Sequence, residues 1–374
     1  MSSLPVPKAV AKMAIPSVIS SLVTVVYNMA DTFFVGQTGD PLQVAAVSLT
    51  NPIFILFMAF ANMFGMGGSA AASMAMGEKN EKRMKQVSAF VTYASLIVGV
   101  ALAVILMVFM TPVLNMFGAN EQTFLYAKGY TFHIAYGAPF IIWSAAASFV
   151  VRAEGASKEA MIGILSGVCV TGLPTAVFSM LMSVSTIVLN QILVAYGNAP
   201  VAAIGIVFKA NMFITFLQMG LANGVQPLLG YNYGSGDHKR FVSVERYTKK
   251  CCVIVGILAT ALFFVLREPI IRLFISDGEV VYYGVKMLIA YMLSGPVIGL
   301  LFVNMNCMQS VGNSFPATIL SVMRQGLLLI PLLYLLNACM GLNGVIYGQA
   351  FTDYAAVILS AVLWRRIRRR IERR

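Results

Sequence analysis

The heptapeptide "GEKNEKR" (Gly77 to Arg83) returns 157 residues later as "GSGDHKR" (Gly234 to Arg240). Other landmarks that follow it repeat at the same distance. A nearly constant offset over a long stretch predicts two homologous copies of one structural unit. The further pairs at this offset are Pro112 and Pro269, Phe117 and Phe274, Pro139 and Pro296, and Gly155 and Gly312.

The composition places both copies in a membrane. Of the 374 residues, 59% are hydrophobic and only 11% are charged, whereas a soluble protein has about 25% charged residues. Because backbone polar groups need internal partners in lipid, apolar segments of about 20 residues indicate transmembrane helices. We therefore expect an all-α polytopic membrane protein of two helical bundles, with about ten spans. These spans are 13–35, 49–76, 87–111, 130–152, 160–195, 202–229, 249–267, 284–310, 316–337 and 343–364.

The loops between these spans alternate in basic charge. With the N-terminus inside, 21 Lys and Arg residues, Arg324 among them, fall on the cytoplasmic side, four fall outside, and Lys209 lies within a span. This asymmetry predicts a multi-pass protein of the cell membrane with both termini in the cytoplasm. The basic tail "RRIRRRIERR" is then expected to contact anionic lipid rather than nucleic acid.

The two copies differ in length. The N-terminal lobe, 1–170, has four helices and a helix stub, "AMIGILSGVCV", whereas the C-terminal lobe, 171–374, has six helices and the basic tail. The last two helices of the second copy have no complete counterpart in the first. We expect span 160–195 to be a fusion of the stub with the first helix of the second copy.

Asp31 lies within the first span, where a charged side chain costs about 2.5–3.5 kcal/mol. Thr24, Tyr27 and Asn28 precede it at helical spacing and form one polar stripe. A carboxylate beside hydroxyl and amide oxygens suits a partly dehydrated Na⁺, or accepts a proton. The alternative is a neutral Asp31 that makes a hydrogen bond between packed helices.

A second stripe follows the last span. Gln349, Asp353 and Ser360 share one face there, and Asn190 lies in an earlier span. Asp353, Gln349 and Asn190 are therefore a candidate second-lobe cation site. Hydrogen bonding between helices explains the same residues, Asn190 in particular.

The sequence shows no sign of an enzyme. "GMGGSAA" is rich in glycine but lies inside a span and lacks the Lys-Ser/Thr ending of a phosphate-binding loop. The five cysteines have no metal-ligand spacing. We expect no cofactor and no metal beyond Na⁺ at Asp31, and we expect an ion gradient to supply the energy.

Four stretches carry a family resemblance: "MAIPSVISSLVTVVYNMADTFFVGQTG", "VRAEGASKEAMIGIL", "GLPTAVFSMLMSVS" and "RQGLLLIPLLY". They resemble the MATE (multidrug and toxic compound extrusion) transporters, nearest to the bacterial multidrug branch. The resemblance implies twelve helices in two lobes, and export of organic cations and amphipathic compounds in exchange for Na⁺ or H⁺.

The resemblance also implies roles for single residues. Asp31 and Tyr27 fall on the N-lobe cation site, and Pro16 falls where the first helix bends in some members. The other N-lobe ligands of the family lie on its fifth and sixth helices. Most of those helices are missing, because the chain passes from Val170 into the second lobe.

Three readings of the function follow. The first is a monomeric secondary exporter of cationic or amphipathic drugs in exchange for Na⁺ or H⁺. The second is a truncated, non-transporting remnant, or a deletion in the gene model. The third is a flippase for a lipid-linked or polysaccharide substrate, although such a cavity would be rich in basic residues and the basic residues here lie almost all in loops.

The orientation can be tested by thiol labelling. A cysteine introduced by Lys79→Cys, in a chain without native cysteines, is expected to resist membrane-impermeant thiol reagents in intact cells and to react once the cells are permeabilised. Ready labelling in intact cells would overturn the assignment.

Overall fold

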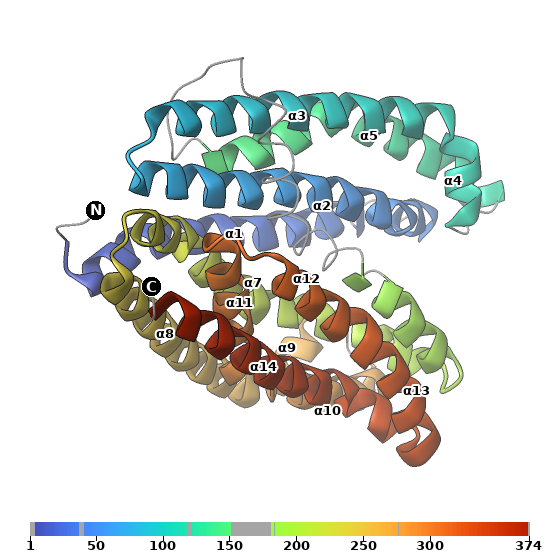
Figure 1. Ribbon diagram of the computed structural model, residues 1–374. Helices are drawn as coiled ribbons and strands as arrows, with labels where there is room; N and C mark the ends of the chain where they lie inside the picture. The colour runs from blue at the N-terminus through green and yellow to red at the C-terminus, as the bar shows by residue number, and fades with distance from the viewer. Residues whose placement is uncertain are drawn as a thin grey trace.

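The computed structural model describes residues 4–36, 41–117, 121–150, 181–182, 184–275 and 277–372. Within these ranges the regular structure is helical, and no strand is present. Figure 1 shows α2, α3 and α5 as one group and α7 to α14 as a second group, with α1 along the boundary between them.

The first half of the chain forms five helices: α1 (Val6–Gly36), α2 (Pro41–Gly77), α3 (Glu81–Val108), α4 (Met110–Met116) and α5 (Glu121–Val150).

The second half begins with the short helical stretch Val184–Val194. It continues with α7 (Asn198–Gly234), α8 (His238–Val265), α9 (Arg267–Arg272), α10 (Gly278–Met292), α11 (Gly295–Ser310), α12 (Phe315–Val322), the π-helical turn η1 (Met323–Leu328), α13 (Leu329–Met340) and α14 (Leu342–Glu372).

Seven helical segments of the described chain are long and apolar enough to cross a membrane, and the bent pair α10–α11 makes an eighth. α5 covers the predicted span 130–152 as far as Val150, where the described segment ends. The predicted span 160–195 lies outside the described residues except at its end, so the fusion of two helix fragments there stays a prediction. α1 begins and α14 ends at the end of the molecule where the α2–α3 and α7–α8 turns lie (Figure 1).

The structure confirms the sequence repeat in detail. Asn80 accepts a hydrogen bond from the backbone N–H of Arg83 at the start of α3, and Asp237 does the same for Arg240 at the start of α8, both at 3.0 Å. These side chains satisfy backbone donors that the first helical turn leaves without a partner. The two caps are 157 residues apart, as the sequence predicted.

A close contact between helices repeats at the same offset. A Cβ added to Gly99 of α3 would lie 2.6 Å from Cα of Pro139 in α5, and one added to Gly256 of α8 would lie 2.9 Å from Cα of Pro296 in α11. Glycine is required at both positions because the facing backbone occupies the space of a side chain. The copies therefore share helix packing as well as sequence.

The copies differ in one bend. The predicted single span 284–310 is two helices, α10 and α11, bent by 47°. Leu293 and Ser294 separate them, and Pro296 lies in the first turn of α11. Proline has no backbone N–H to donate and its ring displaces the preceding turn, so it favours a new helix start. Pro139, its counterpart, leaves α5 unbroken.

α1 packs on the second half of the chain. Ala9, Val10 and Ala14 belong to the same buried cluster as Val225 of α7 and Phe241 of α8. The domain prediction assigned α1 to the N-terminal lobe, 1–170. Its described side chains thus connect that lobe to the C-terminal one.

Glycines of α7 allow this approach. Gly220 and Gly224 face α1, where a Cβ on Gly224 would lie 2.7 Å from Cβ of Ser17. Gly230 and Gly234, also four residues apart, face Ser73 and Met74 of α2. α7 therefore carries two pairs of glycines spaced four residues apart, one pair in contact with α1 and the other with α2. Pairs of small residues at this spacing are common at contacts between membrane helices.

One sequence assignment is wrong. Arg324 was counted among the cytoplasmic loop residues, but it lies in η1, within the apolar run of α12 and α13, and is only 5% exposed. The cytoplasmic excess of basic charge falls by one and keeps its direction. The physical reason is that a buried carboxylate, Asp353, neutralises the guanidinium inside the bundle.

The α1–α7 contact predicts unequal effects of two alanine substitutions on α7. Gly224→Ala is expected to lower the unfolding free energy by about 1–3 kcal/mol, because overpacking shifts α1. Gly205→Ala, whose Cβ meets nothing within 4 Å, is expected to stabilise by up to about 1 kcal/mol through helix propensity. Apparent melting temperatures in detergent measure both, and equal shifts would contradict the contact.

Candidate functional site

The Asp31 stripe lies on α1. The backbone of α1 is helical from Val6 to Gly36, so Thr24, Tyr27, Asn28 and Asp31 lie on one face of it. The surroundings of these four side chains lie outside the described part of the structure. α1 continues through Pro16 as one helix, so the bend that the family resemblance implied there is not a break in the helix.

The part of α1 that precedes this stripe is fixed by its contacts with α7. Ser17 and Ala14 touch α7 through Gly224, and Val25 is fully buried. Asp31 follows Val25 by less than two helical turns. A change in the environment of Asp31 therefore acts on α1, which packs against α7 of the second half of the chain.

The second-lobe candidate is built around a buried ion pair. Nε of Arg324 lies 2.7 Å from Oδ1 of Asp353 on α14, and the two side chains are 7% and 3% exposed. Nε2 of Gln349, one turn earlier on α14, donates to the same oxygen at 3.0 Å. The guanidinium carbon of Arg324 also lies 5.9 Å from the ring centre of Phe302 in α11.

The π-helical turn η1 carries Arg324. A π turn widens the helix by one residue, and such turns are frequent at functional sites. Ser185 donates to the backbone carbonyl of Gln325 in this turn and also to the carbonyl of Leu181 at 2.9 Å. The side chain of Leu181 lies near Gly326. The start of the second repeat is thus packed against the turn that holds Arg324.

These contacts give Asp353 a resident cation. A buried carboxylate that is paired with a guanidinium is neutralised within the protein, and removal of one partner leaves an uncompensated charge that costs about 3–5 kcal/mol. Binding of Na⁺ at Asp353 would require Arg324 to move away. Sequence reasoning found Asp353 and Gln349 and missed Arg324, although its position between apolar residues on both sides was a usable signal.

Asn190, the third residue of this candidate site, is not joined to it. It is half-buried on the helical stretch Val184–Val194, and in the described part of the chain the hydrogen bonds of Asp353 come from Arg324 and Gln349. The structure therefore brings two of the three predicted residues together.

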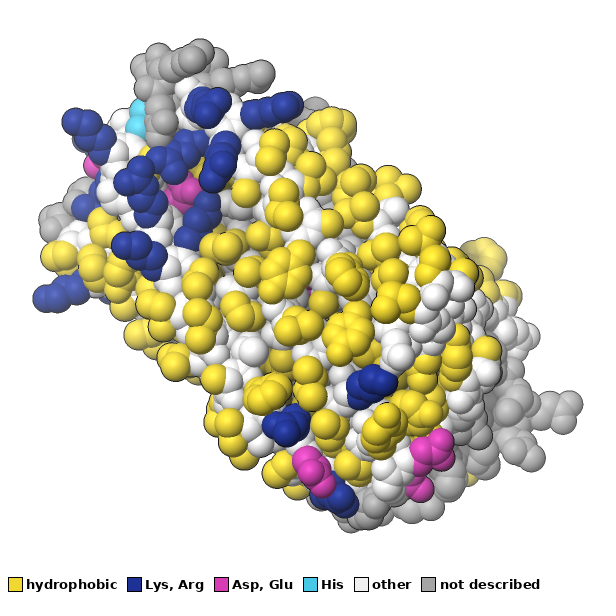
Figure 2. All heavy atoms as spheres, turned by 90° about the horizontal axis from the view of Figure 1, so that it is seen from below, with side chains coloured by type: hydrophobic (Ala, Val, Ile, Leu, Met, Phe, Trp, Pro, Cys, Tyr) yellow, Lys and Arg dark blue, Asp and Glu magenta, His cyan; other side chains and the backbone are white. Residues whose placement is uncertain are grey.

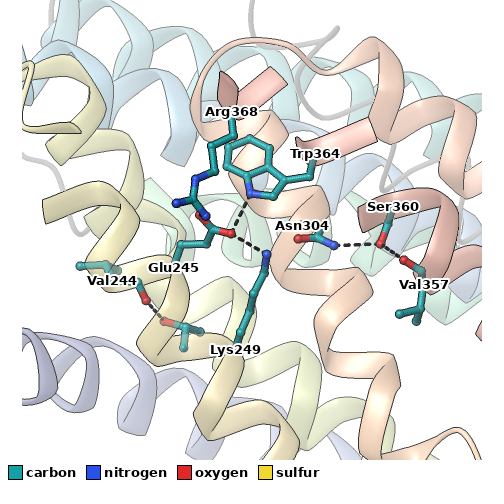
Figure 3. A network of polar contacts seen from close by, with 9 residues as sticks. Val244, Glu245, Lys249, Asn304, Val357, Ser360, Trp364 and Arg368 are labelled. Atoms are coloured by element: carbon teal, nitrogen blue, oxygen red, sulfur yellow. Dashed lines mark hydrogen bonds and ion pairs between the residues drawn. The ribbon is translucent and has the colours of Figure 1, made fainter. Parts of the chain in front are cut away.

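A second buried carboxylate was also missed. Glu245 of α8 is 1% exposed and accepts a hydrogen bond from Nε1 of Trp364 at 2.7 Å. Nζ of Lys249 lies 2.5 Å from it, and Nη1 of Arg368 lies 3.6 Å from it. Figure 3 shows these side chains converging from α8 and α14. Glu245 is near the start of its helix, and its burial cannot be read from that position alone.

Neutral amides connect α7 to its neighbours inside the second lobe. Asn306 donates to Asn223 at 3.0 Å, and Gln226 donates to Gln309 at 3.1 Å. Gln218 donates to the carbonyl oxygens of Cys252 and Gly295. This ladder holds α7, α8 and α11 together without charge.

Within the described residues, no three or more His, Cys, Asp or Glu side chains gather as metal ligands.

The MatE family model matches residues 16–178 and again 174–335. Multidrug export protein MepA of Staphylococcus haemolyticus is 27% identical, with 97% of this chain and 94% of that protein covered. MepA of Staphylococcus aureus strain NCTC 8325 is 25% identical, with 96% and 93% covered.

Solved structures match closely in fold. A multidrug resistance MATE family transporter of the MOP superfamily, in an outward-facing conformation, gives a TM-score of 0.88 at 18% identity, covering 98% of this chain and 97% of that one. A MOP superfamily transporter from Pyrococcus furiosus gives a TM-score of 0.92 at 18% identity, covering 98% and 96%.

The two successive matches to one family model reproduce the repeat that the structure shows in its helix caps and glycine contacts. The matched transporter structure shares this helical fold over 98% of the chain. The chain therefore belongs to the MatE family of membrane transporters.

Proposed function

We propose that this protein is a secondary active exporter of organic cations and other amphipathic small molecules, which it exchanges for Na⁺ or H⁺. The observation that carries the proposal is the polar stripe of Asp31 on the helix that packs between the two lobes. The matched staphylococcal proteins are multidrug export proteins, and this supports the same substrate class here.

The proposed mechanism uses α1 as the connection between ion and lobes. A cation or proton at Asp31 stabilises one packing of α1 against α7, and a drug favours the other. Because a ligand shifts an equilibrium only by its differential affinity for the two states, ion and drug must prefer different arrangements of the lobes. Rocking of the lobes about the cavity between them then moves the drug across the membrane.

Asp353 is the second candidate for the coupling carboxylate. Arg324 already neutralises it at 2.7 Å, so we place coupling at Asp31 and give the Asp353–Arg324 pair a structural role.

We further propose that the protein is a monomer of the cell membrane with both termini in the cytoplasm. The common end of α1 and α14 in Figure 1 supports the shared side of the termini.

An incomplete first lobe is also proposed. The alignment with the S. haemolyticus protein extends over 428 residues, which exceeds the 374 of this chain, so part of that relative has no counterpart here. This observation supports the absence of most of the fifth and sixth helices. It also favours the second candidate function, a protein of this family whose transport is impaired.

Asp31→Asn is expected to abolish ion-driven dye efflux from vesicles, because it keeps the shape of the side chain and removes the group that exchanges charge. The matched control neutralises the internal pair: the double variant Arg324→Gln with Asp353→Asn should retain efflux at equal membrane expression. Loss of efflux in the control alone would move coupling to the second lobe.

Completion of the first lobe is expected to raise transport. A helix pair from a close relative, inserted between Val170 and Thr171, supplies oxygen ligands beside Asp31 and closes the lobe toward lipid; monovalent ions need several oxygens to replace lost hydration. Initial rates of ion-coupled efflux at matched expression compare the two forms. Equal rates would show that four helices and a stub suffice. Both positions lie outside the described residues.

A further inference from the structure

Lysine and arginine side chains gather at one end of the second lobe. Figure 2 shows them together over one end of the face that α8 and α14 form, beyond a surface covered by apolar side chains. Six of these side chains are exposed to solvent. They are Lys239, Arg246 and Lys250 of α8, and Arg365, Arg366 and Arg369 of α14; we call them the basic face.

Each helix carries this charge as the continuation of an apolar stripe. On α8, Leu258 and Ile254 are 65% and 57% exposed, and Lys250 and Arg246 follow on the same side at intervals of four residues. The outer face of α8 therefore changes from apolar to cationic within one helical turn.

α14 repeats the pattern. Ile358 and Val362 are 64% and 43% exposed, and Arg366 and Arg369 continue their side of the helix. An apolar surface that leads directly into cations matches a phospholipid, in which acyl chains lead into an anionic phosphate. Anionic lipids attract clusters of Lys and Arg beside membrane helices.

Glu245 joins the end of α14 to α8. Its carboxylate binds Trp364 at 2.7 Å and Arg368 at 3.6 Å, both on α14, and so fixes the end of α14 on α8 (Figure 3). The negative charge of Glu245 is balanced by its ion pairs with Lys249 and Arg368. Because Glu245 is 1% exposed, it organises the surface without neutralising the basic face.

The basic face has no acidic partner in the described part of the chain. The ion pairs there involve none of its six residues. Asp237, the nearby exposed carboxylate, caps α8 by accepting from the backbone N–H of Arg240.

We propose that the ends of α8 and α14 form a binding site for an anionic phospholipid, with the phosphate headgroup on the basic face and the acyl chains on the two apolar stripes. The proposal needs only that the helices span a membrane, and it is independent of what the protein transports. It commits to lipid rather than free phosphate because the apolar stripes and the cations are continuous.

The first repeat supplies a matched control. Ile97 lies 157 residues before Ile254 and is 61% exposed on α3, but the residues corresponding to Lys250 and Arg246 are Tyr93 and Ala89. The same lipid-facing position thus exists twice in this chain, with Lys250 and Arg246 four and eight residues before position 254, and with Tyr93 and Ala89 at the same places before position 97.

The test measures lipid preference at both positions. Ile254→Trp and Ile97→Trp are made separately in a Trp143→Phe parent, and the parent signal, from buried Trp364, is subtracted. The proteins are placed in vesicles of phosphatidylcholine mixed with brominated phosphatidylglycerol, or of unbrominated phosphatidylglycerol with brominated phosphatidylcholine. Fluorescence quenching then gives the relative binding of the two lipids at each tryptophan.

At position 254 we expect phosphatidylglycerol to be preferred about fivefold or more, since one basic residue near an anionic surface contributes about that factor. At position 97 we expect no preference. Arg246→Gln with Lys250→Gln should reduce the preference at 254 toward one, whereas Lys82→Gln, an exposed lysine of the first repeat, should leave it unchanged.

Two outcomes would overturn the proposal. One is an equal preference at positions 254 and 97, or a preference that survives removal of the cations. The other is loss of the preference at 254 when millimolar inorganic phosphate is added at constant ionic strength, which would mean a phosphate site without a role for the acyl chains. Reduced preference at high salt is expected and supports the electrostatic part.

Discussion

The close approach of backbones along α7 is the contact on which the arrangement of this protein depends. Gly220 and Gly224 admit α1, and Gly230 and Gly234 admit α2. In lipid there is little hydrophobic drive between helices, so contact at small residues and hydrogen bonds between helices must hold a bundle together. α7 also uses Gln218 and Gln226 to bind α8 and α11. One helix therefore joins the two halves and organises the second.

The second governing constraint is that charge inside the bundle must be neutralised from within. Asp353 and Glu245 are both buried carboxylates, and each is paired with an arginine from another part of the fold. The pairs differ in setting: Arg324 is as deeply buried as Asp353, whereas Arg368 and Lys249 reach the surface. The first pair is isolated from solvent, and the second anchors the end of α14 beside exposed cations.

These two constraints give the lobes different characters. The second lobe has its repeat helices, an amide ladder, two internal ion pairs and the basic face. The first lobe has the matching helices α2 to α5, and it shares α1 with the second. Asp31 lies on that shared helix, beyond the glycine contacts. If coupling acts there, it acts on a helix that packs on α7, the helix that also holds α2.

The sequence by itself determined the helical membrane fold, because composition and span length leave few other structures possible in lipid. It also determined the repeat, since the caps Asn80 and Asp237 and the pairs Gly99–Pro139 and Gly256–Pro296 lie at the offset read from the chain. Asp353 with Gln349 was found in the same way, because their spacing along one helix is local.

Only the tertiary structure decided which charges meet. Arg324 and Asp353 are 29 residues apart, and Glu245 and Trp364 are 119 apart, so neither partner can be read from local spacing. The bend between α10 and α11, and the packing of α1 on α7, also depend on neighbouring helices. Helical periodicity shows which residues share a face of one helix, but the partner of that face is set by the packing of elements distant in sequence.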